Sequence, residues 1–337
     1  MVRRCSPRVA VLLAVGASLV SASTASAATL EVVDGTAVFT AAPGETNDVR
    51  AVTRFGVTQL TVTDGGAPLS AGAGCEALAD GSVTCPEDPL APRPLVVRTG
   101  DRADTVLVDD NGFRLVTVQA GSGDDDVTVG SGVGSPAVLD GGSGDDSLTT
   151  DMNGNGPPVL RGGSGDDTLT MNETGGAQAY GGAGDDRIVY AATDFGFPVL
   201  LDGGNGNDTY AFVRSFLAGA MVPGPGFDTL DERTASFAHL DFELSACPGC
   251  VARVIGTPGA DRIVGDSRAQ LIQGGDGDDD LDGGGGLDAI AGQAGDDTIN
   301  ARDRSIDAVS CGVGTDSVTA NRFDLVSRRD CESVSRG

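Results

Sequence analysis

The chain has 337 residues and a formal net charge of −27, from 49 acidic and 22 basic side chains, and all of the basic ones are arginines. This balance argues against nucleic acid and against anionic membrane surfaces as partners, because both require basic patches. Glycine is frequent, at 52 residues, and aromatic residues make up only 4%, but valine and leucine recur too regularly for long disorder.

Residues 1–27 have the pattern of a secretory signal peptide. Three arginines precede an apolar stretch at residues 9–20, and a run of small residues then ends in the A-x-A pattern Ala25-Ser26-Ala27. The apolar stretch is too short to span a bilayer as a helix, so cleavage is favoured over an uncleaved anchor. No later stretch is apolar enough to cross a membrane. We therefore expect a secreted, extracellular chain.

Residues 28–95 are expected to form an N-terminal β cap segment. Thr29–Val33 and Leu60–Thr63 alternate between apolar and polar residues, as half-buried strands do. An exposed edge of a stacked β structure invites pairing with other chains. A cap over the first repeat would prevent this.

Residues 96–230 repeat the segment Gly-Gly-x-Gly-x-Asp-x-apolar at a spacing of about 21 residues. Full copies start at Gly141, Gly162, Gly181 and Gly203, and weaker copies start at Thr99, Ala120 and Pro223. Short β-prone runs precede and follow each loop, so each repeat is one coil with two strands. Such a period is typical of a solenoid.

Two ladders of apolar residues follow from this register. The eighth position of each repeat gives Val127, Leu148, Leu169, Ile188, Tyr210 and Leu230. The position two residues before each loop gives Val97, Val118, Leu139, Leu160, Ala179, Leu201 and Met221. Stacked at strand spacing, these side chains would fill a narrow continuous core.

After an interruption at residues 231–255, the period shortens to nine residues. Copies in the segment 256–300 start at Gly256, Gly265, Gly274, Gly283 and Gly292, and worn copies start at Arg302 and Cys311. Residues 301–337 are expected to close the array as a C-terminal cap. The predicted fold is thus all-β, a parallel β-roll or β-helix solenoid with a cap at each end.

Seven cysteines become six if Cys5 leaves with the signal peptide, and an even number in an exported chain indicates disulfides. Proximity in the sequence suggests the pairs Cys75–Cys85, Cys247–Cys250 and Cys311–Cys331. The C-x-x-C at 247–250 could instead serve redox chemistry or zinc. No βαβ pattern surrounds it and no second C-x-x-C completes a zinc site, so a structural disulfide is favoured.

The loops have the composition of calcium ligands. Calcium takes six to eight oxygens at roughly 2.3–2.6 Å, from carboxylates and backbone carbonyls. One loop cannot supply that many, whereas two stacked loops can. The sixth position offers Asp125, Asp146, Asp167, Asp186, Asp208 and Asp228 in the first array, and Asp261, Asp279, Asp288 and Asp297 in the second. The fifth position adds Asp124, Asp145, Asp166, Asp185, Asp278 and Asp296 as further candidate ligands.

In the nine-residue array, successive loops alternate between two edges. Asp261, Asp279 and Asp297 are expected to share one edge. Asp288 is expected to stand alone on the other, because the neighbouring loop has Gln270 at the matching place, so few or no ions are expected there. Stacked carboxylates repel one another without a cation. The calcium-free array should therefore be loose or unfolded, and calcium should drive its folding.

These loops resemble the nonapeptide repeats of RTX, or haemolysin-type calcium-binding, proteins. The stretch Gly256–Asn300 is most similar, and the 21-residue coils match through their loop halves. The resemblance implies that calcium is coordinated by the sixth-position aspartate, here Asp146, Asp167 and their equivalents, together with loop carbonyls. Typical members leave the cell through a C-terminal export signal and often carry an enzyme or toxin domain. This sequence has an N-terminal signal pattern instead, and no attached domain is recognisable.

No catalytic residue is predicted. The single histidine, His239, excludes a His-Glu-x-x-His or three-histidine zinc centre, and the lack of lysine excludes a Walker-type phosphate loop. The alternative is a calcium-dependent polysaccharide lyase on a parallel β-helix, with Arg187 or Arg214 in a substrate groove. The favoured function is a secreted calcium-binding repeat protein that folds and stiffens on calcium, with a structural or adhesive role at the cell exterior. Its further partner stays open, with nucleic acid and membrane insertion not expected.

Overall fold

The computed structural model describes residues 27–53, 59–88, 91–110, 114–131, 136–152, 156–173, 176–191, 199–213, 219–222, 224–232, 241–243 and 252–337. Within these ranges all regular elements are β-strands. No helix there has the length and apolarity needed to cross a bilayer. Residues 1–26, His239, Arg214, Cys247 and Cys250 lie outside the described residues, and with them most of the predicted signal segment and one predicted disulfide.

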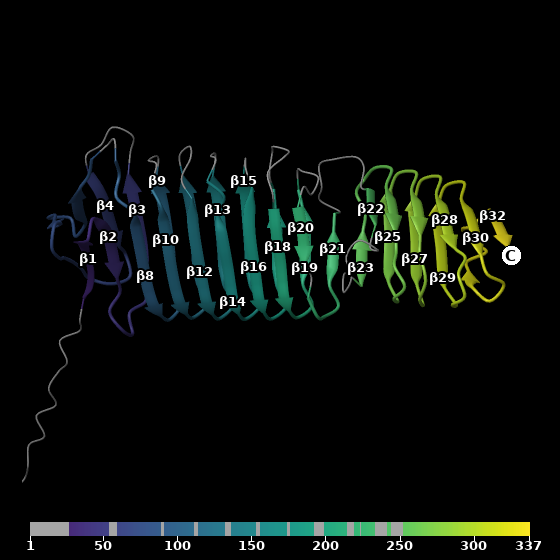
Figure 1. Cartoon of the computed structure of the whole chain (residues 1–337), viewed down its shortest axis with the longest axis horizontal. Helices are drawn as coiled ribbons and strands as arrows, with labels where there is room; N and C mark the ends of the chain where they lie inside the picture. The colour runs from purple at the N-terminus through teal and green to yellow at the C-terminus, as the bar shows by residue number, and fades with distance from the viewer. Residues whose placement is uncertain are drawn as a thin grey trace, which may run out of the picture.

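The strands stack into one long parallel solenoid (Figure 1). Each coil between residues 95 and 231 contributes one strand to each of two sheets, as the sequence predicts. The first sheet contains β8 (Leu95–Asp101), β10 (Val116–Ser122), β12 (Ala137–Ser143), β14 (Val159–Ser164), β16 (Ala177–Ala183), β18 (Val199–Asn205) and β20 (Gly219–Val222). The second contains β9 (Thr105–Asp110), β11 (Asp126–Ser131), β13 (Ser147–Met152), β15 (Thr168–Glu173), β17 (Arg187–Tyr190), β19 (Thr209–Phe212) and β21 (Thr229–Asp231).

The core lies between the sheets and consists of the two predicted ladders. In-register pairing places Val127 beside Leu148 and Leu148 beside Leu169. Both ladders are at most 2% exposed, apart from Met221, whose side chain is outside the described residues. Each coil contributes only a few apolar side chains, so no coil can bury its apolar face alone. The array is expected to fold as a unit.

The N-terminal segment starts both sheets. Its strands are β1 (Ala28–Val33), β2 (Thr36–Thr40), β3 (Asp48–Thr53), β4 (Gln59–Asp64), β5 (Leu69–Ala71), β6 (Glu76–Ala77) and β7 (Val83–Pro86). β2 runs parallel to β8 and β3 parallel to β9, whereas β1–β2, β3–β4 and β4–β7 pair antiparallel. The disulfide Cys75–Cys85 links the loop before β6 to β7. Antiparallel hairpins therefore cover the first parallel coil.

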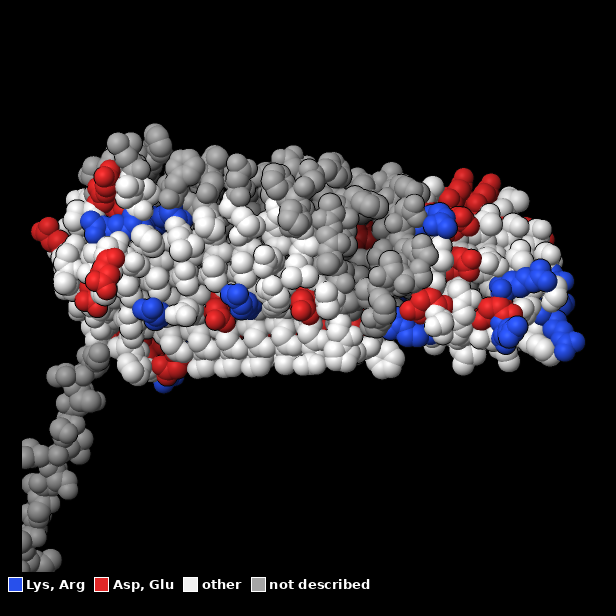
Figure 2. Space-filling view, viewed as in Figure 1, with Lys and Arg blue, Asp and Glu red and all other residues white. Residues whose placement is uncertain are grey.

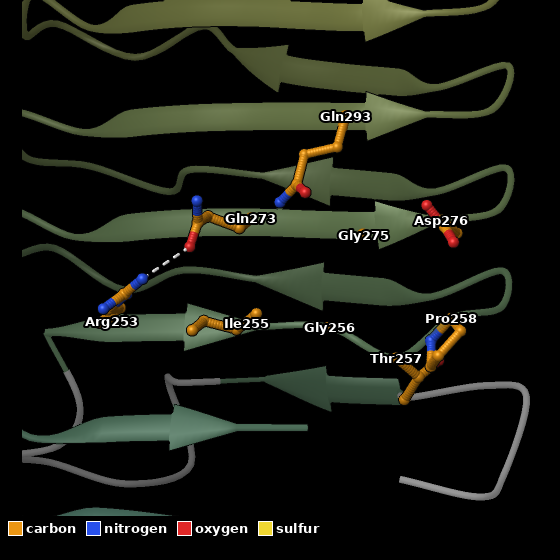
Figure 3. Close-up of a pocket in the computed structure, with 9 residues that line it drawn as sticks. All are labelled: Arg253, Ile255, Gly256, Thr257, Pro258, Gln273, Gly275, Asp276 and Gln293. Atoms are coloured by element: carbon orange, nitrogen blue, oxygen red, sulfur yellow. Dashed lines mark hydrogen bonds between the residues drawn. The ribbon is translucent and has the colours of Figure 1, made fainter. Parts of the chain in front are cut away.

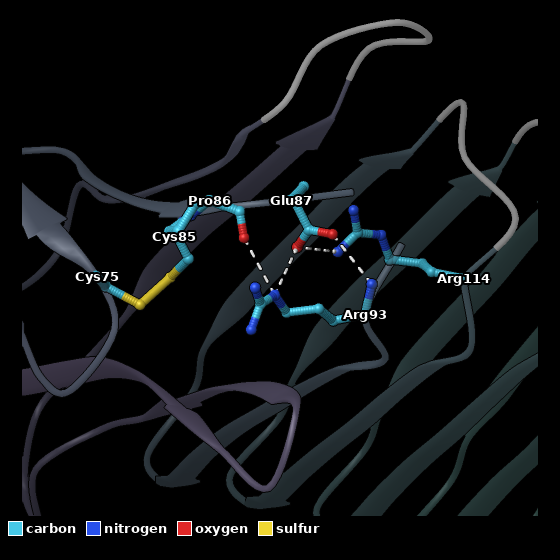
Figure 4. The surroundings of a disulfide bond; sticks show 6 residues. All are labelled: Cys75, Cys85, Pro86, Glu87, Arg93 and Arg114. Atoms are coloured by element: carbon cyan, nitrogen blue, oxygen red, sulfur yellow. Dashed lines mark hydrogen bonds and ion pairs between the residues drawn. A yellow bond between two sulfur atoms is a disulfide. The ribbon is translucent and has the colours of Figure 1, made fainter. Parts of the chain in front are cut away.

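A buried ion pair fastens this segment to the coils (Figure 4). The Arg114 guanidinium, just before β10, lies 3.5 Å from the Glu87 carboxylate, and both side chains are at most 2% exposed. The same carboxylate accepts a hydrogen bond from the Arg93 backbone N–H at 3.0 Å. Arg93 itself is more exposed, and its Nε lies 4.0 Å from Glu87.

Replacing Arg114 with alanine is expected to lower the free energy of unfolding by about 3–5 kcal/mol, because it leaves the Glu87 carboxylate buried without its cation. Arg93→Ala is the matched control. It keeps the backbone hydrogen bond to Glu87 and should cost less than about 1 kcal/mol. Urea denaturation of the two variants measures the difference. Equal losses would mean that the buried pair does not hold the cap in place.

After β21 the coils shorten and a third sheet replaces the first. The second sheet continues through β23 (Arg253–Ile255), β25 (Leu271–Asp276), β27 (Ala289–Ala294), β29 (Ala308–Val313) and β31 (Leu325–Val326). The third contains β22 (Asp241–Glu243), β24 (Arg262–Val264), β26 (Asp280–Asp282), β28 (Thr298–Ala301), β30 (Ser317–Ala320) and β32 (Ser333–Arg336). The disulfide Cys311–Cys331 links the last two coils, as proximity predicted.

Candidate metal centre: the stacked loops

Each loop turns tightly from one sheet to the other, and glycines make the turn possible. Gly163 and Gly165 have φ of +119° and +125°. A Cβ on Gly163 would lie 2.1 Å from the carbonyl oxygen of Gly142 in the preceding loop. Only glycine combines a left-handed backbone with such a close approach. The loops can therefore stack at strand spacing with their backbones in contact.

The sixth-position aspartates form a buried ladder along these loops. In each of them one carboxylate oxygen, Oδ1, accepts a hydrogen bond from the backbone N–H of the matching residue one coil earlier, at 2.7–3.0 Å. The ladder contains Asp104, Asp125, Asp146, Asp167, Asp186, Asp208 and Asp228, all at most 3% exposed. The carboxylates thus lie in one continuous row, fixed by the backbone.

The other carboxylate oxygen, Oδ2, has no hydrogen-bond partner among the described residues. It is buried without a hydrogen bond in all seven of these aspartates, and also in Asp279, Asp288, Asp297 and Asp316. Burial raises the pKa of Asp125, Asp167 and Asp186 to about 7, with neighbouring carboxylates adding to the effect. A buried oxygen without a partner costs about 1–3 kcal/mol, and more when it is charged. A repeated row of such oxygens points to a ligand that satisfies them.

At several coils a backbone carbonyl converges on the same place as the orphaned oxygen. A Cβ on Gly181 would lie 2.2 Å from Asp186 Oδ2 and 2.4 Å from the carbonyl oxygen of Gly203, in the next loop. The equivalent position on Gly162 is 2.2 Å from Asp167 Oδ2. The first-position glycine therefore keeps open a small cradle between a carboxylate and a carbonyl. That combination of ligands is typical of calcium.

Side chains alone do not complete such a site. Within the described ranges, no group of three or more His, Cys, Asp or Glu side chains is placed to hold a metal ion. Backbone carbonyls of two adjacent loops have to supply the remaining ligands. Affinity is then set by how well the loops stack as well as by the number of carboxylates.

Replacing Gly181 with alanine tests the cradle. The added methyl group would occupy the space beside Asp186 Oδ2, so we expect calcium binding at this coil to be lost and the calcium-loaded protein to melt at a lower temperature. Gly130→Ala is the control, because its Cβ would meet nothing within 4 Å. Calorimetric titration with calcium and thermal denaturation compare the two. Equal calcium uptake by both variants would contradict the placement of the ion.

The fifth-position aspartates form a second ladder, and this one is exposed. One carboxylate oxygen of Asp124, Asp145 and Asp166 accepts the backbone N–H of the fifth residue one coil later, at 2.7–3.0 Å. The ladder continues through Asp185, and a matching one joins Asp278 and Asp296. All of these side chains point to solvent. They lie apart from the buried row, and water can satisfy them.

Beyond residue 252 there are two rows of loops. We call edge one the side at the amino ends of the second-sheet strands, and edge two the side at the carboxyl ends of β23, β25, β27 and β29. Edge two holds Asp261, Asp279, Asp297 and Asp316 in one ladder, which Glu332 ends. Asp261 differs from the others because Thr257 donates to both of its carboxylate oxygens.

The expectation that Asp288 stands alone on edge one is wrong. Its backbone N–H donates to Asp307, and the N–H of Asp307 donates to Asp324, at 2.9 and 3.2 Å. Edge one is also the edge of the long coils, because the second sheet runs without a break from β9 to β31. The row of Asp104–Asp228 and the row of Asp288–Asp324 therefore lie on the same side of the solenoid.

Sequence reasoning missed Asp104, Asp307, Asp316 and Asp324. The first three occupy the sixth position of the worn copies that start at Thr99, Arg302 and Cys311. The loops of Asp104 and Asp307 have lost most of their glycines and the loop of Asp316 has lost the first one, which hid these carboxylates. The position of the aspartate in the repeat was the usable signal, since the ladder requires only a carboxylate and a backbone N–H.

A separate groove lies on the outer face of the first nine-residue coils (Figure 3). Arg253 donates to Gln273 at 3.0 Å, and Gln293, with a φ of +85°, and Asp276 complete the polar lining. Of the arginines considered for a lyase, Arg187 does not line this groove. Arg187 is exposed on β17, and Arg214 is outside the described residues.

Comparison with protein-family models finds the RTX calcium-binding nonapeptide repeat in four copies, at residues 159–170, 178–192, 255–290 and 286–303. A search of curated proteins finds no match. The chain therefore carries RTX repeats on a parallel β-solenoid. Such repeats bind calcium ions, and the matched copies include the buried carboxylates of Asp167, Asp186, Asp261, Asp279 and Asp297.

Proposed function

We propose that this RTX-repeat chain is an exported structural protein, in which calcium along the stacked loops converts a loose array into a stiff rod. One observation carries the proposal: the row of buried Oδ2 atoms that lack a hydrogen-bond partner. Calcium there would replace repulsion between like charges with attraction and join each coil to the next. The sixth-position aspartates and the first-position carbonyls would hold it.

Edge one and edge two are both proposed as calcium-binding edges. The orphaned oxygens of Asp279, Asp297 and Asp316 support edge two, and those of Asp288 and the long-coil aspartates support edge one. The fifth-position aspartates are proposed only as a weaker, solvated layer around the ions. Each of them already has one oxygen bonded to the backbone.

Export is supported by the pattern of residues 1–27 and by the two disulfides, which persist in oxidising compartments. Outside the cell, calcium reaches the concentrations at which weak extracellular modules are filled, with dissociation constants of about 10⁻⁴–10⁻³ M. A chain that stiffens only there could present its outer loops for adhesion. No enzymatic activity is proposed.

The test has two measurements on the chelated protein. Equilibrium dialysis against calcium should show several ions bound per chain, with magnesium failing to compete. Small-angle X-ray scattering should show a flexible chain becoming a rod over the same calcium range. A chelated protein that is already a rod and takes up no calcium would make the loops plain solvated turns. Release of unsaturated products from a polyuronate would instead favour the lyase alternative.

A further inference from the structure

The exposed fifth position changes its chemistry along edge one. It is a carboxylate in the long coils, at Asp124, Asp145, Asp166 and Asp185. In the last coils it is Leu287, Ile306 and Phe323, which are 65%, 52% and 60% exposed. The ladder Asp288–Asp307–Asp324 shows that these three loops are consecutive. Large apolar side chains therefore stand in a row where the rest of the edge carries charge.

A second apolar row runs beside the first. At the seventh position the long coils have polar residues such as Asp126, Ser147 and Thr168. The last coils have Leu271, Ala289, Ala308 and Leu325, which strand pairing places side by side. They line a shallow, largely apolar groove, and Leu325 is 70% exposed. We call the two rows together the apolar corner: Leu271, Leu287, Ala289, Ile306, Ala308, Phe323 and Leu325.

Arginines surround this corner. Arg302, Arg304 and Arg322 belong to its loops and are exposed. Arg336 donates to the carbonyl oxygens of Asn321 and Asp324, and so lies at the same edge. Within the described ranges none of the four forms an ion pair with a carboxylate. The Arg322 guanidinium lies 4.3 Å from the centre of the Phe323 ring. Figure 2 shows arginines gathered at the end of the molecule where the chain ends.

Asp303 is the partly exposed carboxylate of these loops, and the backbone fixes its position. Asp303 accepts hydrogen bonds from the backbone N–H groups of Ser305 and Gly286, at 2.6 and 3.2 Å. The acidic fifth-position row is remote, since five strand-to-strand steps separate β17 from β27. At about 4.8 Å a step, this distance exceeds the Debye length of about 8 Å at physiological salt. The corner therefore exposes four arginines around one partly exposed carboxylate, Asp303, while the carboxylates of Asp288, Asp307 and Asp324 are buried beneath it. With calcium bound along that buried row, on which this inference rests, the exposed charge of the corner is positive although the net charge of the chain is −27.

We propose that the apolar corner docks on an anionic phospholipid surface. Phe, Leu and Ile side chains would enter the boundary between headgroups and acyl chains, and the arginines would contact phosphates. A stable protein partner is disfavoured by size, because such interfaces take about 20–30 residues a side. The net charge describes the whole surface of the chain, so it argues against general attraction to anionic surfaces. It does not argue against binding through one patch of arginines. The stacking of the coils brings together arginines and apolar residues from loops that lie about 18 residues apart in the sequence.

The test is cosedimentation of calcium-loaded protein, secreted by an expression host, with vesicles of phosphatidylcholine alone or mixed with phosphatidylglycerol. Binding should require phosphatidylglycerol and weaken with salt. Phe323→Asp and Ile306→Asp should each weaken partitioning by roughly tenfold, because each puts a carboxylate at the boundary. The control is Leu78→Asp, at a leucine 43% exposed in the N-terminal segment, and it should bind as the parent does.

Arg322→Gln provides a second variant that keeps the apolar row and should weaken binding to the phosphatidylglycerol vesicles and reduce its dependence on salt. Calcium-dependent melting of each variant confirms that it is folded. Absence of vesicle binding, or equal binding by Phe323→Asp and Leu78→Asp, would overturn the proposal. So would a dimer in sedimentation velocity that Phe323→Asp dissociates, since the corner would then be a contact between copies of the chain. The calcium proposal does not depend on any of these outcomes.

Discussion

Asp167→Asn is expected to have opposite effects on the calcium-free and the calcium-loaded protein. The amide oxygen can still accept the backbone N–H of Asp146, so the ladder is kept. Removing one buried charge should increase the residual β-strand signal in chelator. It should also raise the calcium concentration at the folding midpoint by roughly tenfold, because affinity follows the number of ligand charges. Far-UV circular dichroism during calcium titration measures both changes.

Asp166→Asn is the matched control for this experiment. Asp166 is adjacent in the sequence but exposed, and its carboxylate accepts the Asp185 backbone N–H. We expect its calcium midpoint to shift much less. If Asp166→Asn shifts the midpoint as far as Asp167→Asn does, the fifth-position carboxylates bind the ion as strongly as the sixth. If neither variant shifts it, the buried row is not the calcium site.

The stability of the calcium-free protein is expected to fall as pH rises from about 4 to about 7. Burial raises the pKa of Asp125, Asp167 and Asp186 from 3.8 to about 7. The folded chain therefore binds more protons than the unfolded chain in this window, and stability decreases with rising pH. The favourable contribution is complete below the ordinary pKa and is lost as pH passes the raised one. Urea denaturation in chelator at pH 5 and pH 8 measures the difference.

Calcium should reverse this dependence. The ion binds deprotonated carboxylates, so its affinity rises with pH and its contribution to stability rises with it. In saturating calcium the protein should be at least as stable at pH 8 as at pH 5. The variant Asp125→Asn/Asp167→Asn/Asp186→Asn should show a smaller pH dependence in chelator. An unchanged slope in this variant would mean that other groups set it.

The apolar ladders show how much of the fold follows from local pattern. A period of about 21 residues predicted two strands per coil, and residues such as Leu148 and Leu169 are fully buried as expected. The buried carboxylates followed from the same register. Position in the repeat alone predicts that the sixth residue is buried and the fifth is exposed. Neighbouring side chains in an extended segment face opposite sides.

The assignment of loops to edges did not follow from the sequence. Nine-residue repeats alternate between edges, so their relation to the long coils depends on how many strands the segment 231–255 contributes. That segment contains no copy of the repeat motif from which its strands could be counted. Among the described residues of that segment, the third-sheet strand β22 lies between β21 and β23, and the continuous second sheet puts Asp288 rather than Asp279 on the edge of the long coils.

The sequence by itself determined the strand period, the core residues and the carboxylates that the backbone encloses, because each depends on contacts between equivalent residues of adjacent repeats. Only the tertiary structure decided which carboxylate oxygen lacks a partner, which worn loops continue a row and where the apolar corner forms. These features depend on the stacking of segments about 20 residues apart, whose register and edge are set by the packed core. A motif read one repeat at a time does not contain that information.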